Sequence, residues 1–510
     1  MADQALSSAA SPVAAGRGRR GPAVVRSGML AMVGLVALGG TRLVHASLIT
    51  RAFGPSTYAE VAILVGLVMT ASLFLPGGLA SAASKFIPYH RGKGDPATAR
   101  SVYRWLTAIG YLSAAGLGLV VALLARTVPG VTWSEAAATG VLTAVFATYS
   151  VAKGELYGFD RVVAYTWLEI AGSAVAIGAT VAIVLAGAHV YLLPLTVGYA
   201  VLAVGALVVL RRRAGEPTAS VGVADRGEMT GFIVLASVGG LASAGLLQLL
   251  PFFAGRFTSA DEVAAFGAAI VLVTPLYFLP RALSMALFPA MAHAHGAGDV
   301  DAVRRHADLT TRALFVVLAP LFAAAATLAR EAMILFGGAD YADDAAVLQW
   351  ILLATYLAVV QVGAVNALSS GSRRQVRIPV FSAVAGAVVG LVALVPLGVG
   401  LGGTGVALAY LLAVVVGAAG PIVAVWRQFA MAWTRPVATA VAVVALATGA
   451  GLLVDRTGGG GTGRVLLDIG LALAFALVGA VVLARDLRTV VAAARARGDS
   501  AGAPAATTGG

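Results

Sequence analysis

Long apolar segments limit most strongly what this chain can fold into. Segments of about 18 to 26 residues, long enough to cross a hydrocarbon layer of about 30 Å as α-helices, recur along almost the whole sequence. Only 11% of the residues are charged and 59% are hydrophobic, too few polar residues to cover a soluble core. Short segments of alternating polarity, typical of membrane β-barrels, are absent from the sequence. We therefore predict an all-α polytopic membrane protein.

The hydropathy pattern predicts about fourteen membrane-spanning helices. The first, third and fourth are the least apolar, which leaves counts of twelve or thirteen open. Most of the 35 Lys and Arg residues fall on one side when the N-terminus is placed in the cytoplasm, as the positive-inside rule requires for an even count. The predicted spans are 28–48, 58–84, 104–125, 135–152, 162–186, 190–210, 229–253, 263–288, 309–329, 345–367, 378–398, 404–425, 436–453 and 465–484.

An internal repeat divides these spans. Segment 72–104 aligns without a gap with segment 276–308, and Phe74-Leu75-Pro76 then falls on Phe278-Leu279-Pro280. This shift places the second span on the eighth, so the repeat is six spans long. An even repeat gives two copies of the same orientation, related by a pseudo-two-fold axis along the membrane normal.

The predicted organisation therefore has six parts, in a multi-pass protein of the cytoplasmic membrane with both termini in the cytoplasm. They are a basic N-terminal segment (1–27), a first lobe (28–210), a cytoplasmic inter-lobe loop (211–228), a second lobe (229–427), two additional spans (428–484) and a disordered cytoplasmic tail (485–510).

A proline occupies corresponding positions of the two copies. Pro76 precedes Gly77-Gly78, whereas Pro280 precedes Arg281. Each proline removes a backbone hydrogen bond and bends its helix, and helix breaks at matching positions of a repeat point to a binding site. A guanidinium at the depth of Arg281 costs about 3 kcal/mol or more unless it faces water, an anion or a partner. We predict that Arg281 binds substrate; pairing with a polar side chain or a carbonyl is the alternative.

Other polar residues in the predicted spans are further substrate-binding candidates. Arg42 lies in the first span, and Gln248 and Gln361 lie in the seventh and tenth. Lys85, at the inner end of the second span, either contacts a phosphate at the entrance or extends to the lipid headgroups.

Two titratable residues form a candidate coupling network. Glu169 lies inside the fifth span, where a carboxylate is often protonated or paired. His45 shares a face of the first span with Arg42. The alternatives are an ion pair of Glu169 with Lys153 or Arg161, and a structural or interfacial role for His45.

Several functions are excluded or disfavoured. The chain has no cysteine, which excludes disulfides and thiolate metal sites, and His293 and His295 lack a third ligand, so we predict neither a metal nor a cofactor. The glycine run 458–461 lacks the Lys-Ser/Thr ending of a phosphate loop. Because no nucleophile–base pair is apparent, we predict no enzyme.

The net charge of +12 indicates orientation charge rather than nucleic-acid binding, and Asp340, Asp343 and Asp344 indicate a solvated outer loop.

Five segments, in the right order, resemble the polysaccharide-biosynthesis (lipid-linked oligosaccharide flippase) family of the multidrug/oligosaccharidyl-lipid/polysaccharide exporters. They are Leu48–Pro55 with Tyr58, Gly78-Leu79 with Lys85, Gly154–Arg161 with Glu169, Phe253–Phe257 with Pro280 and Phe288-Pro289, and Leu335–Gly338 with Tyr341. Two positions depart from the family: Ala59 replaces a usual glycine, and Leu249-Leu250 replaces a common acidic residue.

The resemblance implies a flippase that moves a polyprenyl-pyrophosphate-linked glycan to the outer leaflet by alternating access. Its implied partners are the lipid-linked glycan, membrane lipids and the glycan polymerase or glycosyltransferase machinery. A cation-coupled multidrug antiporter, which would depend on Glu169, and a lipid II flippase are the alternatives.

Overall fold

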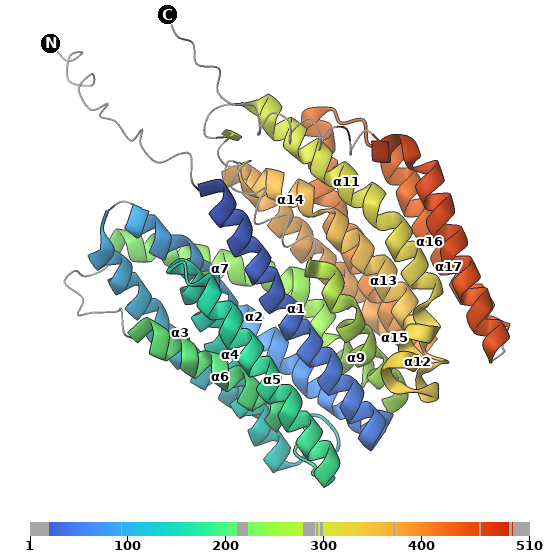
Figure 1. Ribbon diagram of the computed structural model, residues 1–510, viewed down its shortest axis with the longest axis horizontal. Helices are drawn as coiled ribbons and strands as arrows, with labels where there is room; N and C mark the ends of the chain where they lie inside the picture. Colours follow the sequence, from blue (N-terminus) through green and yellow to red (C-terminus); the bar gives the residue numbers. More distant parts are fainter. Residues whose placement is uncertain are drawn as a thin grey trace, which may run out of the picture.

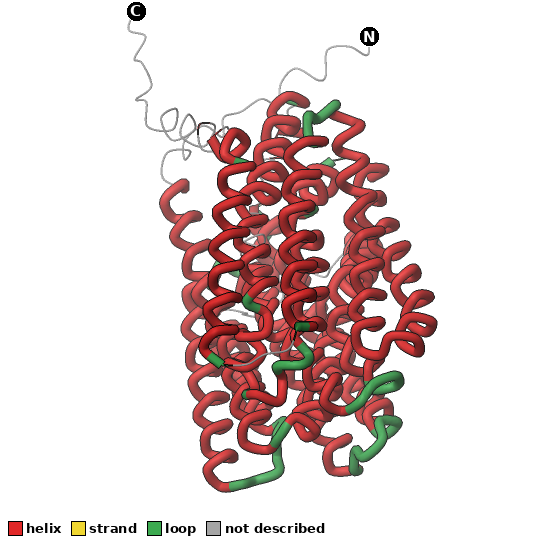
Figure 2. The backbone as a smooth tube through the Cα atoms, turned by 90° about the vertical axis from the view of Figure 1, so that its right-hand side faces the viewer, coloured by secondary structure: helices red, strands yellow, loops and turns green. Residues whose placement is uncertain are grey.

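The computed structural model describes residues 20–92, 94–211, 223–278, 291, 294–295, 299–371, 373–457, 461–488 and 492. Within these ranges the chain is almost entirely helical and contains no strand (Figure 2). Pro280 and Arg281 lie outside the described residues, as do most of the predicted tail, the glycines at 458–460 and the first 19 residues.

The first lobe consists of six long helices (Figure 1). They are α1 (Arg20–Phe53), α2 (Pro55–Gly92), α3 (Pro96–Ala125), α4 (Trp133–Gly158), α5 (Val162–Ala186) and α6 (Leu193–Arg211). Local signals fix some of their ends. The Asp95 carboxylate accepts a hydrogen bond from the Thr98 amide at 2.9 Å and begins α3, and Thr132 and Glu135 form a capping box at the start of α4.

The second lobe is more interrupted. Its elements are α7 (Val223–Gly240), the π-helical turn η1 (Leu241–Gly245), α8 (Leu246–Ala254), α9 (Ala260–Val273), η2 (Thr274–Tyr277), α11 (Val300–Thr327), α12 (Ala329–Gly337), η3 (Ala339–Tyr341), α13 (Ala345–Val360), α14 (Val362–Ser369) and α15 (Arg373–Phe429). Two further helices, α16 (Thr434–Arg456) and α17 (Thr462–Val482), pack against α11 at the edge of this lobe (Figure 1).

The predicted span count agrees with the described helices. Thirteen helical stretches are long and apolar enough to cross a membrane, and one of them, Arg374–Phe429, is 56 residues long. That stretch is broken at Gly402, where φ is 58°, and its two halves pack on each other through Gly386 and Gly417. It therefore crosses twice, which gives fourteen crossings. The chain enters α1 and leaves α17 on the same side, which we call the termini side; the opposite side is the far side (Figure 1).

The two lobes use the same packing pattern. In the first lobe α1 packs on α5 and α2 on α4; in the second, α8 packs on α15 and α9 on α13. These pairings are equivalent under the repeat, because the second span corresponds to the eighth. The predicted fold class, two six-helix lobes related by a pseudo-two-fold axis plus two C-terminal helices, is confirmed.

Helix α2 forms most of the contact between the lobes, since it packs on α7, α8 and α9. Two glycines allow this approach. A Cβ atom on Gly66 would lie under 3.0 Å from the Gln248 carbonyl oxygen, and one on Gly78 would lie under 3.0 Å from that of Ile233. α2 remains one continuous helix through Pro76.

Two features of the fold differ from the sequence prediction. Helix α1 begins at Arg20 rather than near residue 28, because helical hydrogen bonding continues beyond the apolar stretch. The predicted outer loop before the tenth span contains α12, whose nine residues are too few for a hydropathy window to detect.

Candidate functional site

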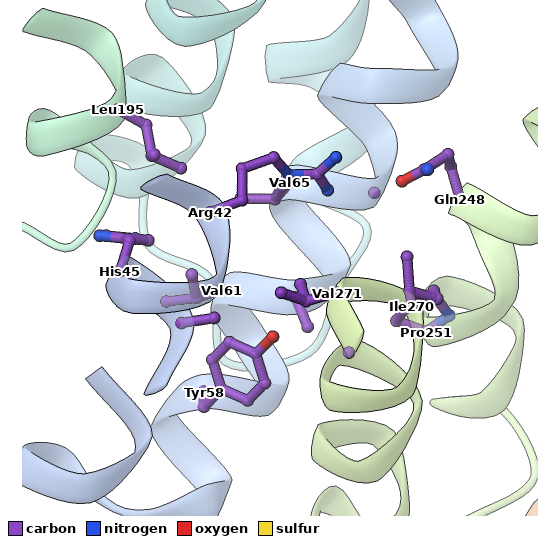
Figure 3. A pocket seen from close by; sticks show the side chains of 14 residues that line it. Arg42, His45, Tyr58, Val61, Val65, Leu195, Gln248, Pro251, Ile270 and Val271 are labelled. Atoms are coloured by element: carbon purple, nitrogen blue, oxygen red, sulfur yellow. The ribbon is translucent and has the colours of Figure 1, made fainter. Parts of the chain in front are cut away.

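A pocket lies between the two lobes, within the membrane-spanning part of the molecule (Figure 3). Helices α1, α2 and α6 of the first lobe and α8 and α9 of the second contribute to its wall. Its lining is mostly apolar, with Val65, Leu195 and Ile270 among the side chains. Three predicted candidates, Arg42, His45 and Gln248, meet there although they are up to about 200 residues apart in the sequence.

Arg42 supplies the charge of the pocket. It lies eleven residues before the end of α1, about 16 Å inside the far end of that helix. Its guanidinium and the Gln248 amide point toward one another from opposite lobes (Figure 3). No described residue forms an ion pair or hydrogen bond with Arg42, and no Asp or Glu lines the pocket. The pocket is therefore cationic and can hold an anion.

His45 is fixed at the edge of the same pocket and is 3% exposed. The Thr180 hydroxyl donates its hydrogen to the Ala176 carbonyl oxygen at 2.8 Å, so it accepts a hydrogen bond from Nδ1 of His45 at 3.0 Å. Nε2 is buried without a hydrogen-bond partner among the described residues. This arrangement assigns the Nδ1–H tautomer to a neutral His45 and leaves Nε2 as a free proton acceptor.

Tyr58 is a lining residue that we did not select from the sequence, although it was part of the family resemblance. It is 3% exposed, lies in the first turn of α2 and contributes its ring to the wall of the pocket (Figure 3). Gly267 of the other lobe lies so close that an added Cβ atom would be 3.1 Å from the Tyr58 hydroxyl. A buried aromatic residue in a membrane span is usually a packing residue, so its residue type alone did not mark Tyr58 as part of a pocket.

Glu169 lies in a second pocket, inside the first lobe, where it is 4% exposed. The Tyr149 hydroxyl donates a hydrogen bond to its Oε2 atom at 2.9 Å. Lys153 lies within electrostatic range of this carboxyl group.

The two pockets are neighbours. Leu195 lines both, and Tyr199 lies within electrostatic range of both Arg42 and Glu169. Glu169, the candidate coupling residue, and Arg42, the candidate binding residue, therefore line neighbouring pockets that share a wall.

Other predicted candidates lie elsewhere. Lys85 is exposed near the termini-side end of α2, with its Nζ atom 4.3 Å from the centroid of the Phe232 ring on α7. Gln361 is half-buried at the junction of α13 and α14. Neither lines the pocket between the lobes. Pro76, Gly77 and Gly78 lie where α2 passes α7.

Glu155 is a buried acidic residue that we did not select as a candidate from the sequence. It is 3% exposed, and its carboxylate accepts a hydrogen bond from the Thr107 hydroxyl at 2.5 Å. No ion pair joins it to a described Lys or Arg. An acidic residue near the end of an apolar span was the available signal. Among the described residues no cluster of three potential metal ligands occurs.

The acidic loop also differs from its prediction. Asp343 is exposed, but Asp344 is half-buried at the start of α13. Burial, and then the charges of Glu262, Asp261 and Asp343, raise the pKa of Asp344 to about 6. The prediction of a solvated loop was wrong for Asp344, which is half-buried beside the acidic residues at the start of α9.

Comparisons with known proteins identify the fold. The MatE family model matches residues 216–397, a little over a third of the chain. No curated protein sequence matches. Among solved structures, "Lipid II flippase MurJ, inward closed conformation" is 12% identical, with a TM-score of 0.61 over 90% of this chain and 99% of that one.

Two further structures show the same likeness. An inward-facing multidrug resistance MATE family transporter of the MOP superfamily is 14% identical, with a TM-score of 0.56 over 79% of this chain and 98% of that one. A MOP superfamily transporter from Pyrococcus furiosus is 16% identical, with a TM-score of 0.55 over 79% and 95%. The chain therefore has the fold of MOP superfamily transporters and contains a region that matches the MatE family.

Proposed function

We propose that the protein is a flippase that moves a polyprenyl-pyrophosphate-linked oligosaccharide or polysaccharide precursor across the cytoplasmic membrane by alternating access. One observation carries the proposal: Arg42 projects into the pocket between the lobes without a counter-charge among the described residues.

The charge of Arg42 is costly to bury. A charged guanidinium in the middle of a span costs about 3 kcal/mol or more unless an anion or water faces it. A pyrophosphate supplies that anion, and the planar fork of arginine suits paired hydrogen bonds to phosphate oxygens. The absence of carboxylates from the pocket lining disfavours a cationic drug as substrate.

The other candidates receive roles within this proposal. Gln248 provides donors and an acceptor for sugar hydroxyls from the opposite lobe, and Lys85 is a first contact for phosphate on the termini side, with that side in the cytoplasm. Arg281 would add a second cation. Glu169 and His45 are the candidates for proton coupling, because an outward-moving anion already follows an inside-negative membrane potential. Gln361 is supported as a substrate-binding candidate only by its position in the second lobe.

The test uses purified protein in lipid vesicles that contain a polyprenyl-pyrophosphate oligosaccharide. Transfer is measured as the fraction of glycan that becomes accessible to an added glycosidase. We expect Arg42→Gln to slow transfer by about tenfold to a hundredfold, which corresponds to the loss of a charge-assisted hydrogen bond of about 1.5–3 kcal/mol. Arg42→Lys should retain part of the rate, because the charge remains.

Arg427→Gln is the matched control, since Arg427 is exposed at the termini-side end of α15. Equal rates for Arg42→Gln and the parent protein would refute the role of Arg42. Transfer of lipid II alone, with no transfer of other lipid-linked glycans, would favour the lipid II flippase. Cation-driven drug efflux that depends on Glu169 would favour the antiporter.

A further inference from the structure

At the far side, the end of α1 reaches across to α12 of the other lobe. The Ser47 hydroxyl donates a hydrogen bond to the Phe336 carbonyl oxygen at 2.6 Å. The Arg51 guanidinium donates to three successive carbonyl oxygens, those of Ile334 at 3.2 Å, Leu335 at 2.5 Å and Phe336 at 3.1 Å.

These carbonyls belong to the last turn of α12. The final four C=O groups of a helix have no partner inside the helix, and the helix dipole places negative charge there. α12 ends at Gly337, and only Ile334 receives a backbone bond, from the Gly338 amide at 2.8 Å. Arg51 therefore caps a helix of the opposite lobe, and this cap is lost if the lobes separate on that side.

A second, buried contact lies beside the first. The hydroxyl groups of Thr50 and Tyr341 form a short hydrogen bond, and both residues are at most 2% exposed. Phe336 packs with its ring 5.8 Å from that of Tyr341 and 5.7 Å from that of Tyr58. Since Tyr58 lines the pocket between the lobes, the contact is continuous with the pocket.

We propose that Ser47, Thr50 and Arg51 of α1, together with Tyr341 and the 334–336 carbonyls of α12, form a far-side latch. The latch closes the pocket on that side and breaks in each transport cycle, when substrate leaves. Tyr58 and Phe336 transmit the state of the pocket to it. The proposal rests on the proposed alternating-access function, but not on the identity of the substrate.

The experiment exploits the absence of native cysteine from the chain. A single cysteine at Val65, which lines the pocket, reports access. The protein is inserted into vesicles in known orientation, and a membrane-impermeant maleimide is added on the far side without substrate. We expect Arg51→Gln, Thr50→Val and Tyr341→Phe each to accelerate labelling, and the Arg51→Gln/Tyr341→Phe double variant to do so by at least about tenfold.

Arg126→Gln is the matched control. Arg126 is also a far-side arginine that donates to a carbonyl oxygen, that of Val131, but this bond lies within one lobe. Its labelling rate should equal that of the parent. A cysteine at exposed Ser134 should label at the same rate in every variant, which controls for the amount and orientation of the protein in the vesicles. Unchanged labelling of Val65→Cys in both the Thr50→Val variant and the double variant would overturn the latch.

A cross-link provides an independent arm. Cysteines at Ser47 and exposed Leu335 are joined by a short reducible bis-thiol reagent. The cross-linked protein should lose transport and slow labelling of the pocket, and reduction should restore both. Full transport by the cross-linked protein would also overturn the proposal. If no glycan is transported but the labelling results hold, the substrate assignment fails and the latch stands.

Discussion

Two ionisable side chains of the first lobe, those of Arg42 and Glu155, have different surroundings. Arg42 is half-buried, unpaired among the described residues and faces a pocket, where water or an anion can offset the cost of its burial. Glu155 is 3% exposed and does not line either described pocket, and its carboxylate has only the Thr107 hydroxyl as a hydrogen-bond partner among the described residues. The side chain of Arg42 therefore faces the pocket, whereas that of Glu155 is part of the packing between α3 and α4.

We predict that Glu155→Gln leaves the protein as stable as the parent or makes it more stable. The amide keeps the acceptor for Thr107 and removes the cost of burying a carboxyl group that has no cation partner. Thermal unfolding in detergent measures the effect. Glu155→Leu should instead lower the midpoint slightly, because the Thr107 hydroxyl loses that acceptor but still donates to the Tyr103 carbonyl oxygen at 2.8 Å. A drop of several degrees for Glu155→Gln would show that the charged form is required.

Helix α12 is the element on which the far side depends. Its C-terminal carbonyls meet Arg51, and its first turn carries Glu331, whose carboxylate oxygens are buried without a hydrogen-bond partner among the described residues. Burial, and then the neighbouring Asp468 of α17, raise the pKa of Glu331 to about 7. Asp468 is itself held by Arg464, which also bonds Asp455.

This pKa predicts a pH dependence. Because the folded pKa lies above the ordinary value of 4.5, protonation of Glu331 stabilises the folded protein. That contribution is fully present below about pH 4.5 and is lost as the pH rises through about 7. We expect the thermal midpoint to fall between pH 5.5 and pH 8, and Glu331→Gln to flatten this dependence. The same slope in the variant would assign the effect to another group.

At the scale of the whole molecule, the close approach of the lobes along α2 depends on small residues. A Cβ atom on Gly78 would meet the Ser237 hydroxyl and the Ile233 carbonyl oxygen under 3.0 Å, whereas one on the adjacent Gly77 would meet only the Ser72 carbonyl oxygen of its own helix, at 3.3 Å. We predict that Gly78→Ala destabilises the protein by about 1–3 kcal/mol.

Gly77→Ala is the neighbouring control. Alanine is favoured over glycine inside a helix by about 0.5–1 kcal/mol, so this variant should be neutral or stabilised. Equilibrium unfolding of both variants in detergent provides the comparison. Equal stability of the two would mean that α2 and α7 do not approach each other as closely as described.

The sequence predicts the fold more completely than the site. Hydropathy reports the cost of transfer into lipid, which is a property of each segment alone, so the spans were recoverable. The repeat was recoverable because residues of the two copies align without a gap. Arg42, His45 and Gln248 were recoverable as candidates because polar residues stand out in apolar spans, but their meeting depends on packing between lobes. Arg51 follows the predicted first span (28–48), and its bonds to α12 depend on a helix too short for the hydropathy pattern to mark.

The π-helical turn in the seventh crossing has a consequence for how its two halves are phased. Positions 233, 237, 240, 245 and 248 of this crossing approach α2, and the step of five residues from 240 to 245 coincides with Leu241–Gly245. Without the extra residue of the π-helical turn, positions 245 and 248 would be rotated by about 100° about the helix axis and would point away from α2. The extra residue therefore keeps Gln248 aimed at Arg42, and losing it would rotate the amide out of the pocket while leaving the span equally apolar.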